Sequence, residues 1–203
     1  GGGGADDIVG GAGDDTLEGG AGDDTIEGGA DVDTVVFGGD KGDFTFALAS
    51  DGTLTVTDTN TNTALGVDTV SGVETLRFND GDLTVTTAAG GAVTLTGSDV
   101  ADDITVVGSV AATLEGTGGN DAITGGGGAD DIVGGTGDDV LATDNEQVVA
   151  DDIVEDLILR GGGGDDTLEG GAGDDRIKGL RGDDTIEGGA GDDILRGDKG
   201  DDT

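Results

Sequence analysis

A unit of nine residues recurs along much of this chain, and it constrains the fold more than any other feature. The segment Gly10–Glu18 is followed at once by Gly19–Glu27, with the same order of residue types. Each unit has Gly at positions one, two and four, Asp at position six and an aliphatic residue at position eight. A repeat of fixed period is typical of stacked architectures, in which each unit contacts only its neighbours.

The repeats fall in two regions. Four nonads run without a break in the first 36 residues, and a second series begins at Gly116 and resumes at Gly161 after an interruption. The position-six carboxylates are Asp6, Asp15, Asp24, Asp33, Asp121, Asp130, Asp139, Asp166, Asp175, Asp184, Asp193 and Asp202. The chain begins on Gly1 without Met, and the last repeat stops at Thr203 before its aliphatic position. We therefore expect a piece of a longer protein.

The composition predicts a thin core and a demand for cations. Only four of the 203 residues are aromatic, all of them Phe, so two close sheets are favoured over a thick globular core. A net charge of −38 would suit a disordered acidic tail, but here the acid is periodic and interleaved with Gly and aliphatic residues. The same charge argues against nucleic acid and anionic membranes as partners, since both require a basic face.

The residue types that are missing narrow the chemistry. The chain has no Cys, which excludes disulfides and thiolate metal sites, and no His, the commonest transition-metal ligand and general base. Carboxylates and carbonyls remain, and these are the ligands of hard cations such as Ca²⁺ and Mg²⁺. No apolar run approaches the length of a membrane span, and no signal peptide is visible.

The nonad itself predicts a turn followed by a short strand. Gly at positions one, two and four permits backbone angles that other residues avoid, so six residues can turn tightly with exposed carbonyls. The next three, such as Thr16-Leu17-Glu18, form a minimal strand whose middle side chain points inward. Two nonads make one coil, and successive coils stack as parallel strands about 4.8 Å apart. The expected fold is all-β, a right-handed parallel β-roll interrupted by a small antiparallel β-hairpin module.

In such a stack, position-six carboxylates eighteen residues apart face one another. The predicted pairs are Asp6 with Asp24, Asp15 with Asp33, Asp121 with Asp139, Asp166 with Asp184, Asp175 with Asp193, and Asp184 with Asp202. Two carboxylates this close repel unless an ion lies between them. Ordinary Asp-Gly turn chemistry is the alternative, and it accounts poorly for twelve nonads in phase.

The nonad resembles the RTX (repeats-in-toxin) repeat of secreted bacterial proteins, a parallel β-helix repeat that binds Ca²⁺. The resemblance implies a Ca²⁺ ion between stacked Asp residues, with further ligands from loop carbonyls at positions one to five. Besides the twelve Asp residues, the predicted metal-site residues are Gly11, Gly13, Gly20, Gly22, Gly162, Gly164, Gly171, Gly173, Gly189 and Gly191. The position-five acids are weaker candidates whose side chains face solvent: Asp14, Asp23, Asp165, Asp174, Asp183 and Asp192.

Some nonads depart from the pattern. Position four is Asp31 in the fourth nonad, and position two is Thr117, Leu180 or Asp198 in others, so we expect distorted or weaker sites there.

Residues 143–160 lack the glycines but have the length of one full coil. We interpret them as an ion-free coil with Val148 and Leu157 at position six, and with strands at 148–150 and 157–159. The alternative is an inserted amphipathic helix that uses Val149, Ile153 and Leu157 at four-residue spacing.

Between residues 37 and 96, Thr alternates with aliphatic residues and Gly-containing turns intervene, which indicates antiparallel hairpins. The stretch Gly66–Phe78 resembles a segment that often follows RTX repeats and forms a small β module at the end of the roll. We expect it to cap the unpaired strands, with the four Phe residues in its core. The predicted domains are a first calcium roll (1–36), this capping module (37–96), degenerate coils that begin with Asp102 and Ile104 in repeat spacing (97–142), the interruption (143–160) and a continued second roll (161–203).

The leading functional hypothesis is a non-catalytic, calcium-dependent structural module that folds outside the cell, in an adhesin, surface layer or extracellular filament. The family resemblance implies type I secretion as an unfolded chain and a location that is secreted, extracellular or on the cell surface. The alternative is a folding and secretion module of an RTX toxin or exoenzyme whose active domain lies elsewhere. Catalysis by this chain is not expected, because no nucleophile and base can be paired. Ice binding is disfavoured, because Glu interrupts the outward Thr positions.

Six of the eight basic residues lie between Arg160 and Lys199. Alternate nonads lie on opposite sheets, so the second roll is expected to have an acidic face and a basic face. The simple reading is relief of local self-repulsion. The other is self-association into fibres or layers, with the acidic sheet of one roll against the basic sheet of another.

Overall fold

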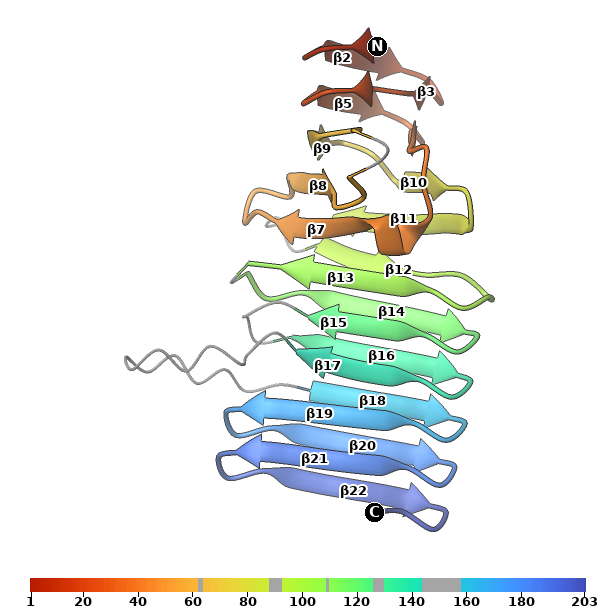
Figure 1. Cartoon of the computed structure of the whole chain (residues 1–203), viewed down its shortest axis with the longest axis vertical. Coiled ribbons are helices and arrows are strands. Elements are labelled where there is room, and N and C mark those ends of the chain that lie inside the picture. Colours follow the sequence, from red (N-terminus) through yellow and green to blue (C-terminus); the bar gives the residue numbers. More distant parts are fainter. Residues whose placement is uncertain (62–63, 88–92, 109, 126–129, 144–157) are drawn as a thin grey trace. The chain divides into compact units, whose positions relative to one another are not determined.

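The computed structural model describes residues 1–61, 64–87, 93–108, 110–125, 130–143 and 158–203 (Figure 1). The chain divides into two compact units, Gly1–Leu95 and Thr96–Thr203. Both are built almost entirely from β-strands. Within the described ranges, no helix has the length and apolarity that crossing a membrane requires.

The first unit contains strands from both the repeats and the non-repetitive segment. Its elements are β1 (Gly2–Gly3), β2 (Asp7–Ala12), β3 (Thr16–Leu17), β4 (Gly20–Ala21), β5 (Thr25–Ala30), β6 (Thr34–Val36), a 3-10 helix η1 (Lys41–Asp43), β7 (Phe44–Leu48), β8 (Leu54–Asp58), β9 (Val67–Ser71), β10 (Thr75–Phe78), β11 (Gly81–Thr87) and β12 (Val93–Thr96). One sheet has the order β2-β5-β9-β8-β7, a second has the order β3-β6-β10-β11-β12, and β1 pairs with β4.

Strand direction changes partway through this unit. β2, β5 and β9 pair in parallel, as do β3, β6 and β10, whereas β7 with β8, β8 with β9, and β10 with β11 are antiparallel. Four Phe rings fill the space between the sheets, with centroids 5.2–6.0 Å apart: Phe37, Phe44, Phe46 and Phe78. The role of residues 37–96 as a cap stays a prediction.

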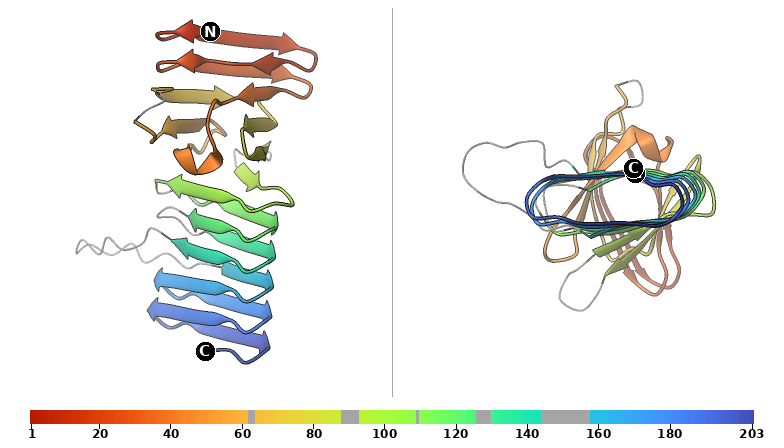
Figure 2. Two further views of the ribbon diagram at one scale, coloured as in Figure 1. Left: turned by 45° about the vertical axis from the view of Figure 1, so that its right-hand side comes forward. Right: turned by 90° about the horizontal axis from the view of Figure 1, so that it is seen from below.

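The second unit is a regular parallel solenoid. Its strands are β13 (Asp103–Val107), β14 (Thr113–Gly118), β15 (Ala122–Gly125), β16 (Asp131–Thr136), β17 (Val140–Thr143), β18 (Ile158–Gly163), β19 (Thr167–Ala172), β20 (Arg176–Arg181), β21 (Thr185–Ala190) and β22 (Ile194–Lys199). Odd-numbered strands form one sheet and even-numbered strands form the other. Viewed from below, the coils of this unit superpose as a flattened oval (Figure 2).

The position-eight aliphatics form the thin core between the two sheets of this unit, as predicted. Each is at most 1% exposed: Ile104, Ile123, Leu141 and Leu168 from one sheet, and Leu114, Ile132, Leu159 and Ile177 from the other. The strand register stacks them in two columns. At the last coil the column opens to solvent, where Leu195 is 45% exposed.

The strands are longer than the sequence pattern predicts. β19 continues through positions one to three of the next nonad, and it pairs with β21 on both sides of Gly170. Position two, exemplified by Gly171 with φ 102°, lets the chain bend and resume pairing. The sharp turn therefore occupies only positions four to six. The predicted division into a six-residue turn and a three-residue strand is wrong, because the strand has six residues.

The predicted strand at 157–159 is found, as the start of β18 (Ile158–Gly163), but the full coil predicted at residues 143–160 is wrong. β16 pairs directly with β18, with Asp131 opposite Ile158, and β17 pairs directly with β19, with Val140 opposite Thr167. Both steps advance 27 residues, where the neighbouring step from Thr113 to Asp131 advances 18. A full coil would place two strands between β17 and β19, one in each ladder, and among the described residues only β18 lies there. Residues 144–157, including the predicted strand at 148–150 and the alternative helix, lie outside the described residues.

Candidate metal sites

The position-six carboxylates form ladders along the stacked coils. The backbone N–H of Asp15 donates to Asp33 Oδ1 over 2.9 Å, and the N–H of Asp166 donates to Asp184 Oδ1 over 3.0 Å. All six pairs predicted from the sequence make this bond: Asp6 to Asp24, Asp15 to Asp33, Asp121 to Asp139, Asp166 to Asp184, Asp175 to Asp193, and Asp184 to Asp202. One carboxylate oxygen of each acceptor is thus fixed by the preceding coil.

The second carboxylate oxygen is buried and unsatisfied in many of these residues. Among the described residues, Oδ2 has no hydrogen-bond partner in a set of six side chains that are largely buried: Asp15, Asp24, Asp33, Asp139, Asp166 and Asp184. An unpaired buried acceptor costs about 1–3 kcal/mol, and more when it is charged. Their recurrence in phase fits a cation-binding position in each nonad.

The unsatisfied oxygen faces a gap at position one of its own nonad. A Cβ built on Gly10 would lie 2.7 Å from Asp15 Oδ2 and 2.6 Å from the carbonyl oxygen of Gly28 in the next coil. Any side chain at position one would fill this space. A gap lined by a carboxylate and a carbonyl oxygen fits a hard cation such as Ca²⁺.

A Ca²⁺ ion at this gap would need ligands beyond the carboxylates, such as backbone carbonyls. Among the described residues, no three carboxylates converge on one point, whereas Ca²⁺ takes 6–8 oxygen ligands. The ten predicted glycines at positions two and four all have φ between 98° and 143°, as tight turns with exposed carbonyls require. Which of their carbonyls bind metal stays a prediction.

The stacked carboxylates are electrostatically costly to keep charged. Burial raises the pKa of Asp166 to about 7, and the charges of Asp139 and Asp184 act in the same direction. Burial also raises the pKa values of Asp139 and Asp184. A cation beside these carboxylates would offset the burial and the mutual repulsion.

The four residues that replace Gly at positions two and four retain the positive φ of the regular nonads. Asp31, Thr117, Leu180 and Asp198 have φ between 75° and 85°, in the region that Gly occupies in the other nonads. A residue with a Cβ there costs about 1–2 kcal/mol. The turn is therefore retained under strain, and the expected distortion does not extend to the backbone conformation.

The position-five carboxylates lie at the surface, but they are engaged. Asp183 N–H donates to Asp165 Oδ1 over 2.8 Å, and Asp192 N–H donates to Asp174 Oδ1 over 2.9 Å. Here the later coil donates to the earlier one, opposite to the position-six ladder. This second ladder was not predicted, because nothing in the residue spacing distinguishes an engaged surface carboxylate from a solvated one.

The interruption changes one pairing. Asp139 N–H donates to Asp166 Oδ1 over 2.9 Å, so these two carboxylates are stacked although 27 residues separate them. The phase in the sequence placed Leu157 there instead. The step between these stacked residues is three nonads in place of the usual two, and only the strand register shows this.

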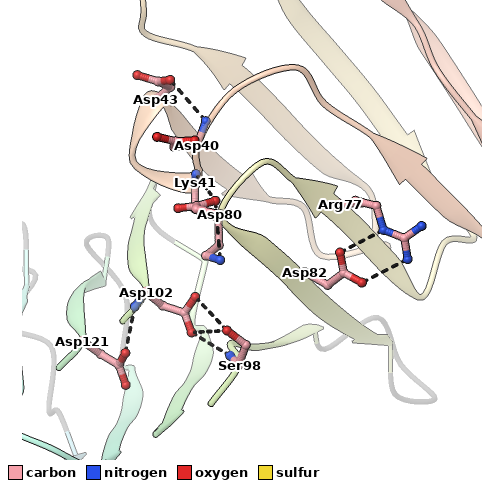
Figure 3. Close-up of polar contacts among 9 residues, drawn as sticks. All are labelled: Asp40, Lys41, Asp43, Arg77, Asp80, Asp82, Ser98, Asp102 and Asp121. Carbon is pink, nitrogen blue, oxygen red and sulfur yellow. Dashed lines mark hydrogen bonds and ion pairs between the residues drawn. The ribbon is translucent and has the colours of Figure 1, made fainter. Parts of the chain in front are cut away.

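At the start of the second unit, two position-six places differ from the repeat. Asp102 N–H donates to Asp121 Oδ1 over 2.9 Å, while Ser98 donates from both its N–H and its hydroxyl to the Asp102 carboxylate (Figure 3). In the other ladder Ala112 takes position six and its N–H donates to Asp130 Oδ1 over 2.8 Å. The position between Ala112 and Asp130 therefore has one carboxylate, where the regular pairs have two.

Two ion pairs of the first unit lie outside the ladders. Lys41 is completely buried, with its N–H 3.0 Å and its Nζ 3.6 Å from Asp80 Oδ1 (Figure 3). Arg77 makes a two-pronged contact of 3.0 and 3.1 Å with Asp82, which joins β10 to β11. In both contacts a cationic side chain lies against a carboxylate of the same unit.

The family model for the RTX calcium-binding nonapeptide repeat matches residues 1–35, 108–141, 158–186 and 169–203, more than half of the chain. The chain belongs to the RTX repeat family. A comparison with curated proteins finds no match. Among solved structures, this RTX chain is similar to the extracellular lipase LipA from Serratia marcescens, at 25% identity and a TM-score of 0.26. The alignment covers 91% of this chain and 31% of the lipase chain, so the RTX chain spans under a third of that protein.

Proposed function

We propose that this RTX chain is a non-catalytic calcium-binding module of a secreted bacterial protein, and that it folds when Ca²⁺ binds outside the cell. The observation that carries the proposal is the buried Oδ2 of the position-six Asp, which faces a gap at position one beside a carbonyl of the next coil. Without a cation these oxygens are desolvated and repel one another. With Ca²⁺ they become ligands.

The free energy of Ca²⁺ binding is large enough to control whether the chain folds. At ten times the dissociation constant, an ion that binds only the folded state stabilises it by about 1.4 kcal/mol per site, so six sites give roughly 8 kcal/mol. This matches the whole stability of an ordinary domain. Extracellular calcium modules have dissociation constants of about 10⁻⁴–10⁻³ M, far above cytosolic free calcium. The chain would then stay open inside the cell, as export of an unfolded chain requires.

Circular dichroism of the metal-free chain tests this proposal. We expect little β structure in chelator and a cooperative gain of β structure with millimolar Ca²⁺. Mg²⁺ should substitute poorly, because it retains its water and requires a small octahedral site. A fully folded spectrum in chelator, or an equal response to both ions, would overturn the switch.

For the parent protein we favour an adhesin, surface layer or extracellular filament, with a toxin or exoenzyme as the alternative. Charge placement in the second unit supports lateral self-association. Lys178 and Arg196 lie in one register column on β20 and β22, next to Arg160 of β18, whose guanidinium is paired with Asp131. On the other sheet Glu169 pairs with Glu187, and both are exposed. Opposite charge on opposite sheets suits contact between copies of this chain.

Light scattering in fixed Ca²⁺ tests the self-association. Assembly should weaken as NaCl is added while the β structure persists. The variant Arg176→Glu, Lys178→Glu, Arg196→Glu should abolish assembly, and the corresponding Gln variant should reduce it less. If the basic residues only relieve self-repulsion, both variants change stability and leave scattering unchanged, which would refute the two-faced model.

A further inference from the structure

The position-six ladders of the first unit continue beyond the repeats. β5 pairs with β9 so that Thr25 faces Thr69, which puts Asp68 at position six of the next coil. β6 pairs with β10 so that Thr34 faces Thr75, which puts Glu74 at the equivalent place in the other ladder. The family model stops at residue 35 in this unit, so neither residue belongs to a matched repeat.

The hydrogen bonds at these two places repeat those of the nonads. Asp24 N–H donates to Asp68 Oδ1 and Asp33 N–H donates to Glu74 Oε2, both over 2.9 Å. The regular pair, Asp15 N–H to Asp33 Oδ1, has the same length. In the backbone, Thr75 N–H donates to the Asp33 carbonyl over 3.1 Å, as Thr34 does to Asp15 over 2.9 Å. The non-repetitive segment thus reproduces the contacts of a nonad.

The gap beside Asp33 is also reproduced. Asp33 is completely buried, and within the described residues its Oδ2 has no hydrogen-bond partner. A Cβ built on Gly28 would lie 2.7 Å from this oxygen and would collide with the carbonyl oxygen of Gly72. Gly72 therefore replaces the position-one carbonyl, and Gly29 N–H donates to it over 3.1 Å, as Gly2 does to Gly19 over 2.9 Å.

We propose that the segment 66–74 completes the last metal site of each ladder in the first unit, with Glu74 and the Gly72 carbonyl closing a Ca²⁺ site at Asp33, and Asp68 closing one at Asp24. This inference rests on the proposed function, because it assumes that the position-six ladder binds calcium. Asp33 Oδ2 and the Gly72 carbonyl oxygen line one gap, and the Glu74 carboxylate contacts the backbone N–H of the same Asp33. Carboxylate and carbonyl oxygens are the donors that a hard cation takes. The bound Ca²⁺ ions would then link the final repeats of the first unit with β9 and β10.

Counting the Ca²⁺ ions bound to the full chain distinguishes failure of this inference from failure of the proposed calcium-binding function. The number of bound Ca²⁺ ions is measured by equilibrium dialysis and native mass spectrometry for the unchanged chain, Glu74→Gln and Asp68→Asn. The amide oxygen of Gln or Asn can still accept the N–H of Asp33 or Asp24, so a merely structural role would survive. We expect each variant to lose one ion, or to bind it at least tenfold more weakly. Glu27→Gln, an exposed change of equal charge in β5, is the matched control and should lose none.

Asp193→Asn, within a matched repeat of the second unit, validates the assay and should lose an ion. If no variant and no unchanged chain binds Ca²⁺, the proposed function fails. If Asp193→Asn loses an ion while Glu74→Gln and Asp68→Asn, folded by circular dichroism at saturating Ca²⁺, retain every ion, the calcium function stands and this inference is overturned. The two variants lie in separate ladders, so one that does not fold leaves the other as the deciding test.

Discussion

At the scale of single residues, the two carboxylate oxygens of the position-six Asp have different roles. Oδ1 accepts the N–H of the preceding coil, and Oδ2 faces the gap at position one. The first role needs only an acceptor atom, whereas the second needs charge. An Asp-to-Asn change separates them, because it retains an acceptor and removes the charge.

Asp184→Asn should weaken calcium-dependent stability more than Asp6→Asn. Asp184 is stacked between Asp166 and Asp202, whereas Asp6 makes one such pair, with Asp24. Loss of two sites at ten times the dissociation constant corresponds to about 3 kcal/mol, and loss of one to about 1.4 kcal/mol. Urea unfolding at fixed Ca²⁺ measures the difference. Equal losses would mean that the two residues do not differ in the number of ions they share.

At the scale of elements, pairing between coils decides where strands run and how the interruption is accommodated. β17 ends at Thr143 and β18 begins at Ile158, and both ladders continue directly across this connection. The connection has nine residues more than a regular nonad allows. Neither strand register nor the Asp139–Asp166 bond depends on those nine.

Deletion of residues 146–154 should therefore leave the second unit folded. Five residues would remain between Thr143 and Ile158, the number in a regular nonad, but none of them is Gly. The shorter loop should stabilise the fold by about 1 kcal/mol, and this gain should be offset by the cost of about 1–2 kcal/mol for each non-Gly residue at a positive-φ position. Calcium stoichiometry should be unchanged. Thermal unfolding in Ca²⁺ and ion counting check this. If the interruption formed a complete coil, the deletion would remove half of it, the alternation of sheets would fail and ions would be lost.

At the scale of the whole molecule, charge sets the stability of the metal-free chain. Burial raises the pKa of Asp166 to about 7 and that of Asp68 to about 6, and neighbouring carboxylates add to both shifts. In an unfolded chain the pKa of Asp is about 3.9. Between these values the folded state binds more protons than the unfolded state, so its stability falls as pH rises from about 4 to about 7.

The metal-free chain should thus show more β structure at pH 5 than at pH 7.5. Asp166→Asn, which imitates the protonated form, should increase β structure at pH 7.5 and flatten the pH dependence. Asp201→Asn, an exposed change of equal charge, should do neither. Circular dichroism of metal-free samples, with light scattering to exclude aggregation near the pI of 4.1, provides the measurement. A loss of structure on acidification would contradict the assigned shifts.

The sequence by itself determined the parallel roll, the inward position-eight column and six stacked carboxylate pairs, because a strict period of nine fixes which residues recur at the same place in each coil. Tertiary structure alone decided the pairings of Asp139 with Asp166, Asp24 with Asp68 and Asp33 with Glu74, which span 27, 44 and 41 residues. The eighteen-residue period of the coil relates none of these pairs, and the separations of 44 and 41 residues are not multiples of nine either. Gly66-Val67-Asp68-Thr69-Val70 does match positions four to eight of a nonad, a signal that could have revealed Asp68, whereas only two residues separate Glu74 from β9. Backbone pairing between coils brings them together, because strands align by hydrogen bonds regardless of how much chain lies between them.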